Sequence, residues 1–92
     1  MHPKISEAIG PLLIKLQDVG VRFGGDSYSE EAFGNFHVDC IVRGKRFRLI
    51  RDRSQYLVDG DIEQLKGLGL WRAYNSPSEY AAAVVVYASS VI

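Results

Sequence analysis

The 92-residue sequence lacks most features that assign a chain to a specialised class of protein. It has one cysteine, Cys40, whereas small secreted domains more often carry an even set of disulfide-bonded cysteines. Its longest apolar run, residues 80–88, is about half as long as a membrane-spanning helix needs to be. Lys4 and Glu7 interrupt the apolar residues near the start, where a signal peptide would have a continuous apolar core. These absences predict a bacterial-type cytoplasmic protein without a membrane segment.

The sequence also has no net charge and no catalytic motif. Eleven Lys and Arg balance eleven Asp and Glu, so no global field attracts nucleic acid or anionic membranes. His37 and Asp39 would share one face of a strand, but a metal or general-base site would need further ligands, and Cys40 would point the other way. The glycine pairs at 24–25 and 67–69 are too short for a phosphate-binding loop. The sequence therefore predicts no enzyme, metal site or cofactor.

What the sequence does contain predicts one folded α+β domain, residues 1–92. Its apolar content of 47% and its ten aromatic residues argue against disorder. A helix is expected over residues 4–19, with a kink or break at Pro11, because proline cannot donate to the preceding turn. The apolar residues at helical spacing are Ile5, Ile9, Leu12, Leu13 and Leu16.

The middle of the chain is predicted to form an antiparallel meander of three or four strands. A short strand is expected at 21–23, followed by a loop at 24–27 because Gly-Gly-Asp-Ser is typical of turns. Strict alternation over residues 36–42 predicts a strand with one buried face, and a tight turn at 43–45 leads to a return strand at 46–51. A further strand is expected at 54–58.

Two helices are expected to complete the fold. A short one covers residues 62–66, and a longer one ends near Ser90 after the start signal Ser76-Pro77-Ser78-Glu79. The longer helix is apolar almost all round, so it is buried on two sides or presents a face to a partner. If it presents a face, the expected homodimer contacts are Val84, Tyr87 and Val91.

Basic residues are concentrated in one segment, residues 43–53. They are Arg43, Lys45, Arg46, Arg48, Arg51 and Arg53. Lys and Arg on an exposed strand can simply prevent edge-to-edge pairing, with no ligand involved. Alternatively, the strand contacts an acidic protein, or it follows a phosphate backbone while Phe47 and Tyr56 stack on bases.

The segment RGKRFRLIRDRSQYLVDG, within residues 36–60, resembles small uncharacterised bacterial proteins of roughly this length. In those proteins a basic-aromatic strand is followed by an Arg-Asp-Arg-x-Gln-aromatic turn, which here is residues 51–56. Some of them are similar to immunity proteins encoded beside toxins. The resemblance carries no catalytic motif, and it implies an inhibitor that binds its target.

The leading hypothesis is a non-enzymatic protein-binding module, in its narrower form an immunity- or antitoxin-like inhibitor of a bacterial toxin. The expected contacts are Arg46, Arg48, Arg51 and Arg53 to an acidic surface, with Trp71 and Tyr74 as apolar anchors. The alternatives are a small nucleic-acid-binding domain that uses residues 43–53 and a homodimer built on the last helix.

Overall fold

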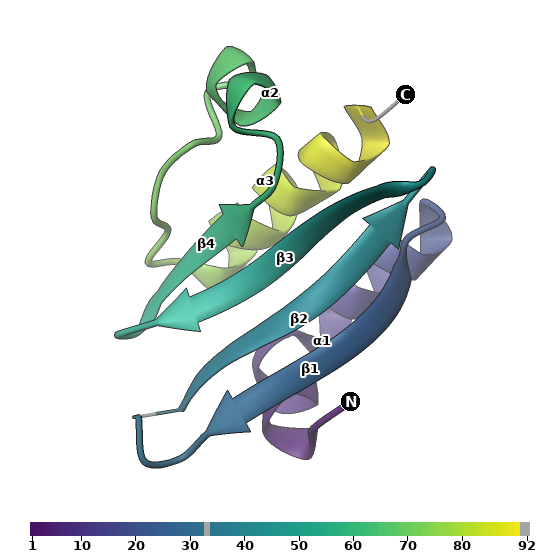
Figure 1. The fold of residues 1–92 in the computed structure, drawn as a ribbon. Helices are drawn as coiled ribbons and strands as arrows, with labels where there is room; N and C mark the ends of the chain where they lie inside the picture. The colour runs from purple at the N-terminus through teal and green to yellow at the C-terminus, as the bar shows by residue number, and fades with distance from the viewer. Residues whose placement is uncertain (33, 91–92) are drawn as a thin grey trace.

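The computed structural model describes residues 1–32 and 34–90 and confirms the α+β class (Figure 1). Its elements are α1 (Pro3–Asp18), β1 (Arg22–Ser29), β2 (Asn35–Val42), β3 (Lys45–Asp52), β4 (Gln55–Asp59), α2 (Ile62–Gly67) and α3 (Pro77–Ser90). The strands form one antiparallel sheet in the order β1-β2-β3-β4, which is the expected meander. The helices flank the meander in sequence, as the periodicity predicts.

The two long helices lie side by side on the same face of the sheet. Figure 1 shows α1 behind β1 and β2, and α3 behind β3 and β4. The reason is the alternation in the central strands, which turns every second side chain of β2 into the core. Between the layers lie the apolar stripe of α1 and the buried side of α3, so the core is a single layer on one side of the sheet.

The β2–β3 hairpin fixes the register of the sheet. Its two loop residues, Arg43 and Gly44, both have positive φ angles, 48° and 78°. Two-residue loops with positive φ at both positions match the right-handed twist of the flanking strands. The loop sets Val42 opposite Lys45, and every cross-strand pair toward the far end of the hairpin follows from that one.

Helix α1 contains the kink that Pro11 predicts. Ile9 leaves the helical region, with φ −132° and ψ 22°, and the helix then continues to Asp18. Both halves nevertheless bury their apolar residues, because the kink keeps them against the curved sheet and α3.

The expected loop at residues 24–27 is wrong, because these residues belong to β1. Phe23 pairs with Cys40 and Asp26 pairs with Val38, so β1 advances three residues while β2 advances two. This is a β-bulge, and glycine is common in bulges because it tolerates their irregular backbone. The Gly24-Gly25 pair marks a bulge in a continuous strand, and the turn follows only after Ser29.

The expected dimer contacts on the last helix are also wrong where the structure describes them. Val84 and Tyr87 are fully enclosed by the sheet and by α1, so neither is available to a second copy. Val91 lies outside the described residues. Helix α3 is apolar nearly all round because it is buried on two sides: α1 covers one side, and on the other Tyr80 donates its hydroxyl hydrogen to the carbonyl of Leu57 in β4.

Candidate protein-binding site: the open sheet face

The sheet has one face that none of the described helices covers, here named the open sheet face. Pairing across the strands arranges its side chains in four rows. The rows are Arg22, Ile41 and Arg46; Asp39, Arg48 and Asp59; Ser27, His37, Ile50 and Leu57; and Ser29, Asn35, Asp52 and Gln55. They run from a basic end near the β2–β3 turn to a polar, acidic end near the β3–β4 turn.

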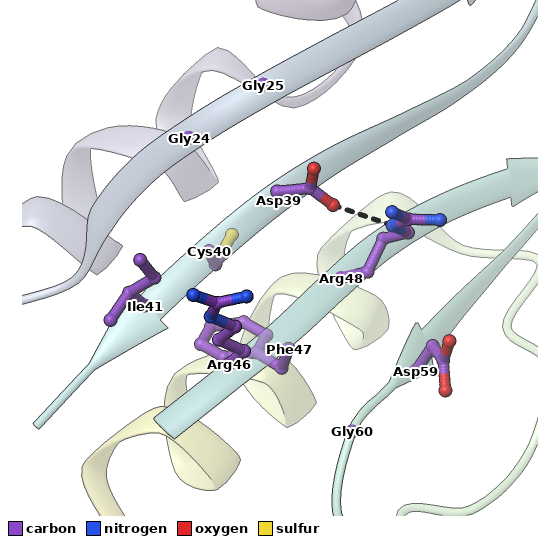
Figure 2. Close-up of a pocket in the computed structure, with 10 residues that line it drawn as sticks. All are labelled: Gly24, Gly25, Asp39, Cys40, Ile41, Arg46, Phe47, Arg48, Asp59 and Gly60. Carbon is purple, nitrogen blue, oxygen red and sulfur yellow. Dashed lines mark hydrogen bonds and ion pairs between the residues drawn. The ribbon is translucent and has the colours of Figure 1, made fainter. Parts of the chain in front are cut away.

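The second row consists of one basic residue between two acidic residues. Arg48 lies between Asp39 on β2 and Asp59 on β4, and its Nε is 2.6 Å from the Asp39 Oδ1 (Figure 2). Both side chains of this ion pair remain almost half exposed, so solvent screens it and its net contribution to stability is small, roughly 0–1 kcal/mol. Its effect is to fix the Arg48 guanidinium in one place on the face.

A shallow hollow of about 610 Å³ lies over this row and its neighbour at the basic end. Asp39, Arg46, Arg48 and Asp59 contribute its charged groups, and Gly24 and Gly25 leave its β1 wall without side chains (Figure 2). A second hollow of about 310 Å³ extends from Arg48 past His37 to Asp52. Arg48 lines both hollows, so the two lie next to each other along the face.

Apolar side chains interrupt the charges on this face. Ile41, Ile50 and Leu57 point away from the core and remain partly accessible. Ile50 and Leu57 are directly paired across β3 and β4. Apolar side chains rimmed by both signs of charge, on a face with water on one side, are typical of surfaces that bind another protein.

The structure separates the four arginines expected to act together. Arg46 and Arg48 lie side by side on the open sheet face, as expected. Arg51 is paired with Phe36 and Tyr56, which places it on the helix side of the sheet, with its Cζ 5.7 Å from the centre of the Tyr56 ring. Arg53 lies in the β3–β4 turn with a φ of 52°. The expected patch of four therefore reduces to Arg46 and Arg48.

Arg43, in the β2–β3 turn, has surroundings of its own. The Arg43 guanidinium donates to the carbonyl of Ala88, 3.4 Å away, near the last turn of α3. A positive charge there satisfies an end carbonyl and is favoured by the helix dipole. Arg43 therefore stabilises the fold, and part of the basic cluster has a structural explanation.

The two expected apolar anchors are not equivalent. Trp71, in the connection between α2 and α3, is 46% exposed, and it lies outside the open sheet face. Tyr74 is only 3% exposed: its backbone bonds to Tyr56 through two hydrogen bonds of 2.8 Å, and Arg72 covers its ring. Tyr74 as an anchor is therefore wrong, because its ring belongs to the core.

The aromatic residues of the basic segment do not face outward either. Phe47 and Tyr56 are both buried on the helix side, where Phe47 packs edge-on against Tyr87 and Tyr56 stacks on Tyr80. No described Phe, Tyr or Trp side chain of β2, β3 or β4 is therefore placed to stack on a base from the open sheet face, where His37 is the one ring of these strands. The acidic residues Asp39, Asp52 and Asp59 on that face would also repel phosphate groups.

His37 and Asp39 share the open sheet face, as their spacing predicts, but the carboxylate of Asp39 pairs with Arg48. Burial, with a smaller effect of the Asp39 charge, raises the pKa of the Cys40 thiol to about 12, so Cys40 is a protonated core residue. Within residues 1–32 and 34–90, no three His, Cys, Asp or Glu side chains are grouped to hold a metal ion.

Sequence reasoning did not single out Arg22, Ile50, Leu57 or Asp59 as parts of the site. The signal for Ile50 was present, because a two-residue loop at 43–44 places residue 50 opposite residue 37 and on the outward side. Leu57 and Asp59 can be assigned to this face only if the position of the β3–β4 loop is known, and Arg22 only if the bulge in β1 is known. Local residue types do not reveal either feature.

Comparison of the chain with protein-family models, with curated proteins and with solved structures finds no match. Among the described helices, none has the length and apolar character needed to cross a membrane. The functional argument therefore depends on the open sheet face alone.

Proposed function

We propose that this protein is a non-enzymatic protein-binding module whose partner docks on the open sheet face. The observation that carries the proposal is the one-sided layering of the fold. Both long helices cover the same face, and the other face presents two adjacent shallow hollows and the partly accessible side chains of Ile41, Ile50 and Leu57 among charged residues.

The mixed charge of this face favours a protein over a nucleic acid as the partner. Arg46 and Arg22 supply positive charge at one end, whereas Asp39, Asp52 and Asp59 alternate with basic or neutral residues elsewhere. Such a pattern gives specificity and register against a partner of complementary charge, but it does not attract a uniformly negative polymer. A matching partner presents carboxylates opposite the Arg46 end and apolar side chains opposite Ile50.

A narrower form of the proposal is an immunity- or antitoxin-like inhibitor that blocks a toxin by occupying its surface. Its support is the resemblance of residues 36–60 described above. In this form the partner is an enzyme, and stoichiometric addition of the protein abolishes its activity. The test is an activity assay of the captured partner with increasing amounts of the protein.

The binding proposal is tested by affinity capture from a bacterial lysate with matched variants. Arg46→Glu combined with Ile50→Ser changes the charge and the apolar area of the open sheet face. Lys66→Glu combined with Ile62→Ser makes the same changes on α2, where both residues are exposed. We expect a stoichiometric partner that survives nuclease treatment to be retained by the wild type and the α2 variant and lost by the open-face variant.

Either of two results would contradict the proposal. Equal capture by the two variants would show that the partner binds elsewhere. Loss of every captured component on nuclease treatment would instead identify nucleic acid as the ligand. Circular dichroism of both variants serves as the folding control, because all four substituted side chains lie outside the core.

A further inference from the structure

The two edge strands of the sheet, β1 and β4, differ in whether their outer backbone groups are paired. At the β4 edge, Tyr74 in the segment after α2 bonds to both backbone groups of Tyr56, so one residue of this edge is already paired. At the other edge, β1 pairs with β2 on one side only, and no strand of the described residues pairs with its outer side. A free edge presents a row of unpaired N–H and C=O groups to any strand that fits it.

Beside this edge runs a groove of about 540 Å³ between α1 and β1. Phe23 and Gly24 form its strand side, and Ser6, Gly10 and Ile14 are among the residues on its helix side. Ile14 is 62% exposed, more than any other large apolar side chain of the described residues. The groove therefore joins a free row of backbone groups to an apolar wall.

The flank of α1 that faces the groove carries no charge. The α1 residues that line the groove are Ser6, Gly10, Leu13, Ile14 and Gln17. The charged residues of the helix, Lys4, Glu7, Lys15 and Asp18, do not line it. Asp26, on the strand side, accepts the backbone N–H of His2 at 3.1 Å. Two copies of this flank can meet without opposing like charges on their helices, as an isologous interface requires.

We propose that the β1 edge and the α1 flank form a homodimer interface, with β1 pairing antiparallel to β1 of a second copy. A two-fold axis perpendicular to the sheet at this edge creates one eight-stranded sheet with all helices on one side. The groove between α1 and β1 lies beside this axis, so the uncharged flank of α1 faces its counterpart in the second copy.

In such a dimer the two α1 helices approach each other across the two-fold axis, on the helix side of the joined sheet. The small residues Ser6 and Gly10 permit this approach, and a Cβ added at Gly10 would meet no other atom within 4 Å in one copy. Ile14 then lies against the second copy and is removed from water. The strand pairing and the helix packing are thus satisfied by one symmetry operation, which favours a second copy over an unrelated extended peptide.

Mass measurement with matched variants tests the interface. We expect light scattering and sedimentation to give twice the 10.3 kDa chain mass for the wild type. Ile14→Lys should give the monomer mass, because it places a charge in the interface. Val86→Lys, a matched change at an exposed apolar position of α3, should leave the dimer intact. A wild-type monomer at high concentration, including one that binds an extended peptide in the groove, would overturn the proposal.

Spin-label distances identify which surfaces meet. Labels on Ser27→Cys report on β1 and labels on Gln55→Cys report on β4, while Cys40 is buried and stays unlabelled. We expect the Ser27 labels to be the closer pair, because the Gln55 labels are separated by seven strand spacings, about 34 Å. Gln55 labels closer than Ser27 labels would place the interface elsewhere. Neither result depends on capture of a partner, so this proposal and the binding proposal fail independently.

Discussion

At the scale of single residues, Gly60 shows how closely the sheet and the helical layer approach each other. A Cβ at this position would lie 2.5 Å from the hydroxyl oxygen of Tyr87 and 3.2 Å from the Cβ of Phe47. The same hydroxyl accepts the backbone N–H of Asp61 at 3.0 Å, and the Asp61 side chain caps α2. The absence of a side chain at Gly60 therefore lets one tyrosine on α3 hold the start of α2.

We predict that Gly60→Ala lowers the free energy of unfolding by about 1–3 kcal/mol, because an overpacked core must shift neighbouring atoms. Tyr87→Phe removes the nearest atom, so the double variant should lose less stability than the sum of the two single variants. Urea denaturation of the four proteins measures this coupling. Gly67→Ala, which meets no atom within 4 Å, is the control, and simple additivity of the two changes would contradict the proposed contact.

At the scale of elements, the two hairpin turns adopt similar backbone conformations with different residues. The β2–β3 loop has Gly44 at its second position, whereas the β3–β4 loop has Ser54, with a φ of 65°. For a residue with a Cβ, positive φ costs roughly 1–2 kcal/mol. Asn35 offsets part of this cost by accepting the backbone N–H of Arg53 at 3.0 Å. The second turn is therefore the more strained of the two.

Exchanging glycine and serine between the turns should give opposite results. Ser54→Gly is expected to stabilise the protein by about 1 kcal/mol, which raises the Tm by roughly 4–8 °C for a chain of this size. Gly44→Ser is expected to destabilise it by a similar amount. Thermal unfolding followed by circular dichroism checks both, and a change of the same sign in the two variants would refute the argument.

Elements with a strong hydrophobic periodicity or a clear start signal could be predicted from the sequence. Features that depend on which strands pair with each other could not. The alternation in residues 36–42 and the N-cap at Ser76 each follow from local rules, and Ser76 Oγ accepts the Glu79 N–H at 3.4 Å. Gly24-Gly25 fits a turn equally well by local rules, and only the neighbouring strand β2 makes it a bulge. The second hairpin was expected from the strands at 46–51 and 54–58, but its two-residue loop was not placed at 53–54, because Arg53-Ser54 lacks the glycine that marks such turns.

At the scale of the whole molecule, the single core places two weak acids out of reach of water. Cys40 lies on β2 and Tyr80 on α3, and both point into the layer between the sheet and the helices. Burial raises the pKa of the Cys40 thiol from its ordinary value of 9.0 to about 12, and burial also raises the pKa of Tyr80. Both groups are neutral when protonated, so the folded state keeps protons that the unfolded chain releases.

This difference predicts alkaline destabilisation. Above pH 9 the unfolded chain loses the Cys40 proton while the folded chain retains it, so the free energy of unfolding falls as the pH rises toward 12. The slope from this thiol is about 1.4 kcal/mol per pH unit. Cys40→Val removes this contribution, and denaturation between pH 8 and 11 should show a shallower fall in the variant. Parallel curves for the two proteins would show that the thiol does not contribute.

The site could be predicted less completely than the fold, because it depends on which face the helices leave uncovered. The cluster of six basic residues is visible in the sequence, yet Arg43, Arg48 and Arg51 have three different surroundings in the structure. The alternation that turns Phe47 and Leu49 inward also turns Arg51 inward, so that assignment could have been corrected from the sequence alone. That both long helices lie on the same face of the sheet could be learned only from the structure.

The pairing of Tyr74 with Tyr56 makes the two edges of the sheet unequal as places where copies of this protein could join. A sheet with two free edges can add copies at both ends, and such growth continues into fibres unless a rotation closes it. Here Tyr74 already bonds to Tyr56 on the outer side of β4, whereas no described strand bonds to the outer side of β1. A strand added at β4 would have to displace this bridge, so two copies joined through β1 would carry an obstructed edge at each end, which disfavours growth into fibres.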